Sequence, residues 1–245
     1  MLFSDYFKLN LKQKDMDFLD VPVDTDWEFF IDPFAITKEA KNRNPFAISC
    51  HNLIVDYFQT LLDLIRSKKK HDALIRLSGI KEPNETHLGY STKVSKGRSV
   101  GEIKDQHIFD SLANSKAVIS GDLKDLEDCD LVIKGISFDN ISDITTCIIR
   151  EFLADFTLSQ CKRHGISTSA TKRYNIWDTR AGGWKITTLD LPEVSGKNGT
   201  TDVLLIPKTW IREKFTITLM IILIFGFWKN CKILMSQRKA PYLTL

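Results

Sequence analysis

The sequence predicts a mixed α+β protein. Residues 1–213 are expected to form a single globular domain with a long central helix and a C-terminal hairpin and strand. Three patterns support this: two segments with apolar residues at helical spacing, and a pair of aromatic-rich runs joined by glycines. A chain of 245 residues, 43% apolar and 27% charged, can bury a core of this kind.

Charge and cysteine content indicate a cytoplasmic protein. The 34 basic and 31 acidic side chains leave a formal charge of +3, so any attraction to nucleic acid or to a membrane must be local. The five cysteines include no Cys-x-x-Cys pair, which favours a reducing compartment. Charges interrupt every apolar stretch near the N-terminus, unlike in a secretory signal. We therefore expect a cytoplasmic location, and these features do not favour membrane association.

The first predicted strand is the apolar run Phe29-Phe30-Ile31, which lies between Pro22 and Pro33. Three acids surround this run: Asp24, Asp26 and Asp32. Such residues are typical of solvent-facing turns, and a metal site is the alternative.

The most regular predicted helix covers residues 46–67. Asn44 can cap it and Pro45 suits the first helical position. Its apolar residues recur three or four positions apart: Leu53, Ile54, Tyr57, Phe58, Leu61, Leu62 and Ile65. A second, shorter helix through Leu74 and Leu77 is expected to stop before Gly79.

A long polar loop is predicted between Gly79 and Gly101. Its basic residues Lys93, Lys96 and Arg98, together with neighbouring glycines, are candidates for nucleic-acid binding, because positive charge and backbone amides can cradle phosphate. A solvated loop is the alternative, and the segment has no Walker sequence. A helix over residues 103–112 should follow, whereas residues 126–136 fit either a helix or a strand.

The central long helix is expected to begin after Ser142, whose hydroxyl can accept a hydrogen bond from a first-turn amide. Asp143 adds favourable charge there, and Gly165 ends the helix. Residues 174–178 and 184–189 then predict a hairpin, in which Trp177 and Trp184 form a packing pair or, alternatively, stack bases.

The last element expected in the domain is a buried strand over residues 203–206, which ends at Pro207. After it, the tail over residues 214–245 differs in composition from the domain. Phe215 to Trp228 carries no charge, yet it is shorter than the roughly 17–25 residues of a membrane-spanning helix. Three interpretations stay open: a short membrane anchor, a core segment, or a frame-shifted end. When the tail is back-translated and read one base earlier, the degenerate codons permit a soluble sequence rich in Tyr and Asp.

Asp139 and Asp143 are the candidate catalytic and metal-binding residues. Their four-residue spacing can place two carboxylates near one divalent cation. With Lys208 as a phosphate-stabilising lysine, they would form the site of a metal-dependent nuclease that uses Mg²⁺. Lys134 and Asp202 are further candidates for its basic and acidic residues. The restriction-type pattern is incomplete, because an apolar residue occupies the slot of its second acid. The alternative is that both acids only favour a turn and a helix start.

The histidines offer no nucleophile motif. Cys50 and His51 are adjacent, but neighbouring residues on a helix point about 100° apart, so they would not face each other.

Three segments together resemble a family of bacterial proteins associated with mobile elements, including plasmids, and with phage resistance of the abortive-infection type. The segments are Phe29 to Phe34, Leu88 to Ser91, and Gly135 to Thr146. The resemblance spans residues 20–213 and implies that the stretch from Ile141 opens a helix. It also implies a soluble C-terminus rich in Tyr and Asp, from which this chain departs after Phe215. The family supplies no established catalytic residue.

We therefore expect a phage-resistance protein that acts on nucleic acid, as a metal-dependent nuclease. The rival expectation is a non-catalytic interaction or regulatory module that binds a phage or host protein.

Overall fold

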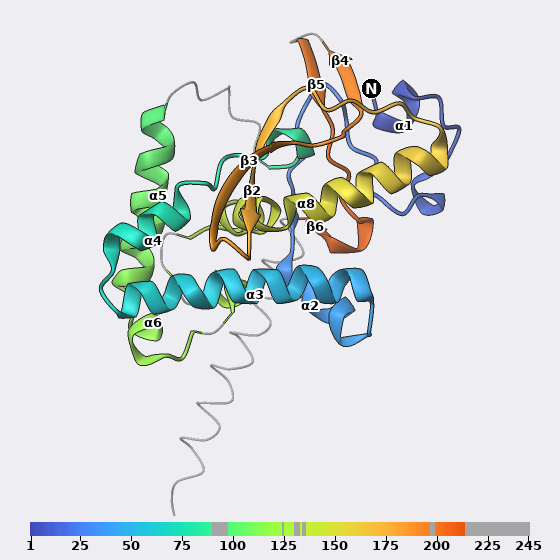
Figure 1. Cartoon of the computed structure of the whole chain (residues 1–245). Helices are drawn as coiled ribbons and strands as arrows, with labels where there is room; N and C mark the ends of the chain where they lie inside the picture. Colours follow the sequence, from blue (N-terminus) through green and yellow to red (C-terminus); the bar gives the residue numbers. More distant parts are fainter. Residues whose placement is uncertain (90–97, 124, 130–132, 134–135, 197–198, 214–245) are drawn as a thin grey trace, which may run out of the picture.

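The computed structural model describes residues 1–89, 98–123, 125–129, 133, 136–196 and 199–213. The fold is α+β, as predicted, with long helices and small antiparallel sheets (Figure 1). The helices are α1 (Phe3–Tyr6), α2 (Pro33–Lys41), α3 (Pro45–Arg66), α4 (Lys70–Leu77), α5 (Arg98–Ala113), α6 (Lys116–Ser120) and α8 (Phe138–His164). The strands are β1 (Phe29–Ile31), β2 (Arg173–Asp178), β3 (Gly183–Thr188), β4 (Glu193–Gly196), β5 (Gly199–Asp202) and β6 (Ile211–Glu213). Short 3₁₀ turns are η1 (Gln13–Asp15), η2 (Asn84–Thr86), η3 (Leu126–Asp128) and η4 (Lys208–Trp210).

Helix α3 confirms the most regular prediction. The Asn44 side chain accepts hydrogen bonds from the amides of Phe46 (3.1 Å) and Ala47 (3.4 Å), and Pro45 is the first helical residue. Helix α4 ends at Leu77, two residues before Gly79, as expected. The apolar face of α3 lies in the main core, together with residues of α4, α5, α8 and the β2–β3 hairpin.

Helix α8 begins earlier than predicted. Its N-cap is Ser137, whose hydroxyl accepts from the Asn140 amide (3.4 Å), so the prediction that Ser142 caps the helix is wrong. The hydroxyl of Ser142 is buried and accepts instead from the backbone amide of Ile31 (2.9 Å). The predicted end is confirmed, because Gly165 follows the last helical residue with φ of +67°.

The predicted hairpin is confirmed as β2 and β3, in which Trp177 and Trp184 lie opposite each other. Their rings are 5.3 Å apart at 74°, and Trp177 also packs edge-on against Tyr57 of α3 (4.8 Å). Trp177 is almost fully buried, so the pair packs in the core, as the first of the two interpretations predicted.

The predicted strand over residues 203–206 is not present. The segment is buried, but its backbone bonds partners other than a neighbouring strand. The amide of Leu204 donates to the carbonyl of Glu85 (2.7 Å), and the amide of Leu205 donates to the hydroxyl of Thr157 (2.9 Å). The pattern predicted burial correctly, yet burial alone does not decide which groups satisfy the backbone. The C-terminal strand of the described chain is β6, which pairs with β1.

A second, smaller core lies between the N-terminal segment and the β4–β5 hairpin. Its buried residues are Phe3, Met16, Phe18, Val21, Val23, Val194, Val203 and Leu205. Within the described residues, no helix is both long and apolar enough to span a bilayer. The predicted tail, residues 214–245, lies outside the described residues.

Candidate acidic site at the start of α8

Asp139 and Asp143 occupy successive turns at the N-terminal end of α8. Residues four apart on a helix lie on the same face, so both carboxylates are directed to one side. Asp139 lies in the first turn, where the helix dipole favours negative charge. Asp143 is more enclosed, with 6% of its surface exposed.

The lysine that meets this site is Lys104 of α5. Its ammonium Nζ lies 2.6 Å from Oδ2 of Asp143. Glu82, from the segment that follows α4, is close enough to act electrostatically on both members of the pair. Sequence reasoning missed Lys104 and Glu82, because neither stands in a local motif with the two aspartates.

The electrostatics of the site raise the pKa of both members of the pair. Burial raises the pKa of Asp143 to about 6; Lys104 counteracts this, while Asp139 and Glu82 add to it. Burial by itself would lower the pKa of Lys104, but Asp143 and the other two acids outweigh that effect and raise it. At pH 7 the pair is therefore charged, with Asp143 close to its titration point.

The backbone of Gly89 lies directly against Asp139. A Cβ atom built on Gly89 would be 3.2 Å from Oδ1 of Asp139, and φ of Gly89 is +113°, which L side chains rarely adopt. The Gly89 amide also donates to the carbonyl of Trp27 (2.9 Å). A side chain at this position would crowd the carboxylate.

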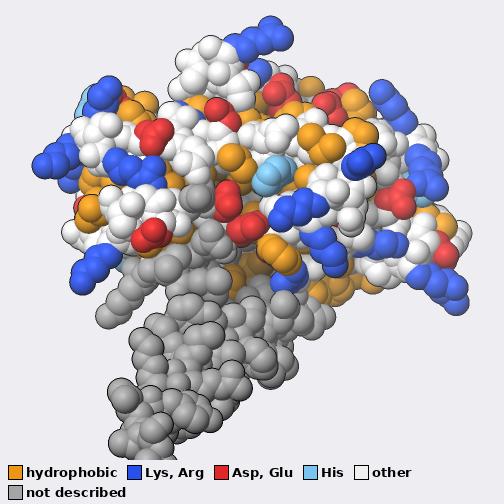
Figure 2. All heavy atoms as spheres, turned by 90° about the horizontal axis from the view of Figure 1, so that it is seen from below, with side chains coloured by type: hydrophobic (Ala, Val, Ile, Leu, Met, Phe, Trp, Pro, Cys, Tyr) orange, Lys and Arg blue, Asp and Glu red, His pale blue; other side chains and the backbone are white. Residues whose placement is uncertain are grey.

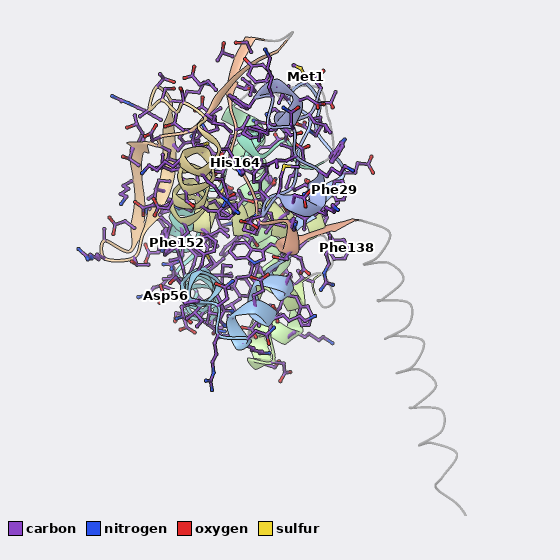
Figure 3. The ribbon with its side chains drawn as sticks, turned by 90° about the vertical axis from the view of Figure 1, so that its right-hand side faces the viewer. Met1, Phe29, Asp56, Phe138, Phe152 and His164 are labelled. Carbon is purple, nitrogen blue, oxygen red and sulfur yellow. The ribbon has the colours of Figure 1, made fainter. Side chains whose placement is uncertain are left out.

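The three segments that carry the family resemblance meet, in their described parts, at the start of α8. Ile31 of β1 bonds Ser142, and Gly89 abuts Asp139. Figure 3 labels Phe29 of β1 close to Phe138, the first residue of α8, while His164 marks the other end of the helix. Segments more than forty residues apart in sequence thus form one structural unit.

Lys208 and Asp202, which the sequence also suggested for the site, have other partners. The ammonium of Lys208 donates to the carbonyls of Gln13 (3.3 Å) and Lys14 (2.9 Å). Asp202 pairs with Lys172 (3.0 Å) and accepts from the hydroxyl of Tyr174. Lys93, Lys96, Lys134 and the side chain of Arg98 lie outside the described residues.

The acidic N-terminal residues have separate partners. Asp24 pairs with the N-terminal amine (3.3 Å), and Asp32 caps α2 through the Phe34 amide (3.0 Å) and pairs with Arg212. Asp26 lies 3.9 Å from Nδ1 of His87. Across the described part of the chain, no group of three or more His, Cys, Asp or Glu side chains is arranged to hold one metal ion.

The fold and the site define an α+β protein in which a partly buried ion pair between Lys104 and Asp143 joins helices α5 and α8. Residues 8–218 match a family described as a domain of unknown function, DUF8370, and the chain belongs to this family. The matched region ends close to Phe215, where the composition changes. No curated protein and no solved structure matches the chain. The association with phage resistance and mobile elements stays a prediction.

Proposed function

We propose that the chain is a phage-resistance protein that hydrolyses phosphodiester bonds of nucleic acid at the site formed by Asp139, Asp143 and Lys104. The contact that carries this proposal is the 2.6 Å pair between Lys104 and Asp143, with a second carboxylate one helical turn away. It brings together two acids and a lysine, the side-chain types of a nuclease site, from helices far apart in sequence.

The chemistry of phosphodiester hydrolysis matches these groups. A base must take a proton from the attacking water, and a base that titrates near the working pH does this best. The pKa of Asp143, about 6, lies in that range. Negative charge that develops on the phosphoryl oxygens needs a positive donor, and the Lys104 ammonium is positioned beside the base.

A divalent cation also fits the donor set. Mg²⁺ is commonly held by one or two carboxylates, with water and substrate phosphate completing its shell, so Asp139 and Asp143 would be its ligands. In that arrangement Asp143 would hold the ion and would not act as the base. The bound ion would polarise the phosphoryl group as a Lewis acid.

The distribution of charge on the surface favours a local nucleic-acid interface over one that covers the whole protein. Figure 2 shows basic side chains over the face seen from below, with acidic side chains among them. This mixture agrees with the small net charge of +3. Binding to nucleic acid would then depend on contacts near the acidic site, at moderate salt.

The cellular part of the proposal, a cytoplasmic role in resistance to phage, rests on the resemblance of the three segments at the start of α8. Its test is the plating efficiency of phages on bacteria that produce the wild-type chain or the Asp143→Asn variant. We expect fewer plaques with the wild type only. Equal plaque numbers with and without the wild-type protein, over a broad phage panel, would refute this role.

The biochemical test is hydrolysis of labelled RNA and DNA by the purified chain with Mg²⁺ or Mn²⁺. We expect Asp143→Asn and Lys104→Met to reduce the rate about 100-fold or more, since each removes a group used in the transition state. Lys185→Gln, which breaks a surface pair with Glu151 (3.5 Å), is the matched control and should retain activity.

A non-catalytic interaction or regulatory module is the second candidate. It is favoured by the same ion pair, because Lys104 neutralises Asp143 and can simply dock α5 onto α8. In that case the wild type hydrolyses neither RNA nor DNA, and the two variants change only stability. The activity would then be binding to a phage or host protein, and substitutions of surface residues should abolish that binding.

A further inference from the structure

The turn that joins α3 to α4 concentrates positive charge. Residues 66–72 contain four basic side chains and one acid, Asp72, so their formal net charge is +3. The whole chain has the same net charge of +3, which means that the charges of all other residues balance. Figure 2 shows Lys and Arg side chains at the left end of the molecule, the end at which α3 meets α4 in Figure 1. The turn is therefore a local source of positive potential.

Three lysines of this turn, Lys68, Lys69 and Lys70, are exposed and have no acidic partner. The acid that precedes them, Asp63, pairs with Arg66 instead (3.2 Å). In the part of the chain that the structure describes, no carboxylate lies within salt-bridge distance of the three ammonium groups. Their charge is available to a partner from outside the chain.

The backbone at the end of α3 places Lys68 where glycine is usual. The amide of Lys69 donates to the carbonyl of Leu64 (2.9 Å), and the amide of Lys68 donates to that of Ile65 (3.0 Å). These bonds close the helix, and they require a left-handed residue, which is most often glycine. Lys68 takes this conformation with φ of +58°.

Lys69 and Lys70 are equally unusual at the start of α4. Lys69 occupies the N-cap position without a side-chain cap hydrogen bond, although Ser, Thr, Asp and Asn are preferred there. Lys70 is the first helical residue, where the helix dipole disfavours positive charge. Three consecutive lysines thus depart from local preferences, and such departures are expected at functional sites.

The turn lies against α5, the helix that also carries Lys104 of the acidic site. The ammonium of Lys70 lies 5.3 Å from the centre of the Phe109 ring, in a cation–π contact. Phe109 follows Lys104 by five residues, which corresponds to roughly 7.5 Å of helical rise. Because one turn of duplex is about 34 Å long, one bound nucleic acid can contact the turn and the acidic site together.

We propose that this turn is the docking surface for the phosphate backbone of nucleic acid, and that Lys68, Lys69 and Lys70 each neutralise a phosphate. Such contacts position a nucleic acid without reading its sequence. A protein partner would need an apolar centre in its interface, and residues 67–72 offer only polar and charged side chains. The inference rests on the proposed function, because the strand held here is the one that the acidic site would hydrolyse.

The test measures binding of labelled RNA and DNA to the full chain by fluorescence anisotropy, without divalent cations, between about 50 mM and about 200 mM salt. The turn variant combines Lys68→Asn, which tolerates positive φ, with Lys69→Gln and Lys70→Gln. We expect binding to weaken about tenfold or more, and the slope of log affinity against log salt to fall by about 2–3, since three phosphate contacts are lost. Comparing RNA with DNA shows which of the two is preferred.

The control removes the same charge at the opposite end of the molecule, where α8 ends beside the N-terminal segment (Figure 1). It combines Lys12→Gln, Lys14→Gln and Lys162→Gln, which change three exposed lysines. This variant should bind nucleic acid like the wild type. If the turn variant and the control bind equally well or are equally weakened, the turn is not the docking surface and the proposal is overturned.

The single variant Lys69→Asp guards against loss of folding. An acid is preferred at the N-cap, so this variant should have the circular dichroism of the wild type and still bind nucleic acid more weakly. A wild type that binds neither RNA nor DNA at low salt would overturn the proposal and leave the turn to an acidic protein partner.

The outcomes for docking and for hydrolysis are separate. If the turn variant loses binding but the wild type hydrolyses neither RNA nor DNA, the docking surface is supported and the nuclease proposal fails. If the wild type hydrolyses nucleic acid and the turn variant binds it as tightly as the wild type does, the nuclease proposal is supported and the docking surface fails.

Discussion

Trp184 packs directly against Gly79, so closely that a Cβ atom built on Gly79 would lie 2.1 Å from Cδ2 of the indole. The indole N–H of Trp184 donates to the carbonyl of Arg76 (2.7 Å), and the side-chain amide of Asn175 donates to the carbonyl of Gly79 (3.2 Å). Glycine is required here because the hairpin approaches the end of α4 through backbone contacts.

Gly79→Ala should lower the free energy of unfolding by about 1–3 kcal/mol, since overpacking forces the indole or the backbone to move. Urea unfolding followed by circular dichroism measures the change. Gly183→Ala is the control, because a Cβ atom there meets no atom within 4 Å. Equal unfolding midpoints for wild type and Gly79→Ala would show that the hairpin is not held at this contact.

Ser142→Ala should destabilise the protein by about 1–3 kcal/mol, because the buried amide of Ile31 would lose its acceptor. Ser49→Ala removes a hydroxyl that donates to the Pro45 carbonyl on the exposed surface, and it should cost less than about 0.5 kcal/mol. Comparing the two serine variants by urea unfolding separates burial from loss of a hydroxyl. A Ser142→Ala variant as stable as Ser49→Ala would contradict the assigned bond.

The same serine explains what the sequence could predict about α8. Its apolar repeat and its end at Gly165 are local features, and both were predicted correctly. The start was misplaced because Ser142 resembles a cap, whereas its hydroxyl serves an amide 111 residues away in sequence. Capping preferences describe local bonds, and they carry no information on such a partner.

In the candidate site, too, the sequence indicated local spacing but not the contacts between residues far apart in the chain. The four-residue spacing of Asp139 and Asp143 suggested two carboxylates near one cation, but the helix was expected to begin only after Ser142, so the position of Asp139 on α8 was not predicted. Lys104 lies 39 residues from Asp143, and only the packing of α5 against the rest of the fold brings it there. Lys208 was the lysine predicted to stabilise phosphate charge, yet its ammonium donates to the carbonyls of Gln13 and Lys14.

His87 combines burial with an uncommon backbone conformation. Its φ is +54°, its side chain is 7% exposed, and Nε2 has no hydrogen-bond partner among the described residues. Burial lowers the pKa of His87 below its ordinary 6.5, with Asp26 and Asp24 opposing the change. The unfolded chain therefore takes up this proton more readily than the folded one.

The sign of the pH effect follows from that difference. The stability linked to His87 is complete above about pH 6.5 and is lost as the pH falls toward the lower folded value. His87→Asn, which tolerates positive φ, should reduce the loss of stability between about pH 7.5 and about pH 5.5. Urea unfolding at both pH values measures this loss of stability. His71→Asn changes an exposed histidine of α4 and should leave the pH dependence as in the wild type. If the stability of His87→Asn fell with pH as steeply as that of the wild type, the pH dependence could not be attributed to His87.

Lys104→Met should destabilise the protein at neutral pH and less so in acid. Without Lys104, the charged carboxylate of Asp143 is buried beside Asp139 and Glu82, and its pKa should rise above the present value of about 6. A raised folded pKa favours the folded state at low pH, and that benefit is lost as the pH rises through it. We expect a loss of about 1–3 kcal/mol near pH 7.5, because one partner of a largely buried pair is missing.

The control for Lys104→Met is the double variant with Asp143→Asn, which removes the carboxylate as well. It should lack the pH dependence that comes from Asp143 between about pH 5 and about pH 7.5 while keeping the part linked to His87, and at pH 7.5 it should be more stable than Lys104→Met alone. Urea unfolding of both variants across this range gives the comparison. If Lys104→Met loses the same stability at every pH, the lysine acts by packing of its methylene chain, and its charge does not compensate Asp143.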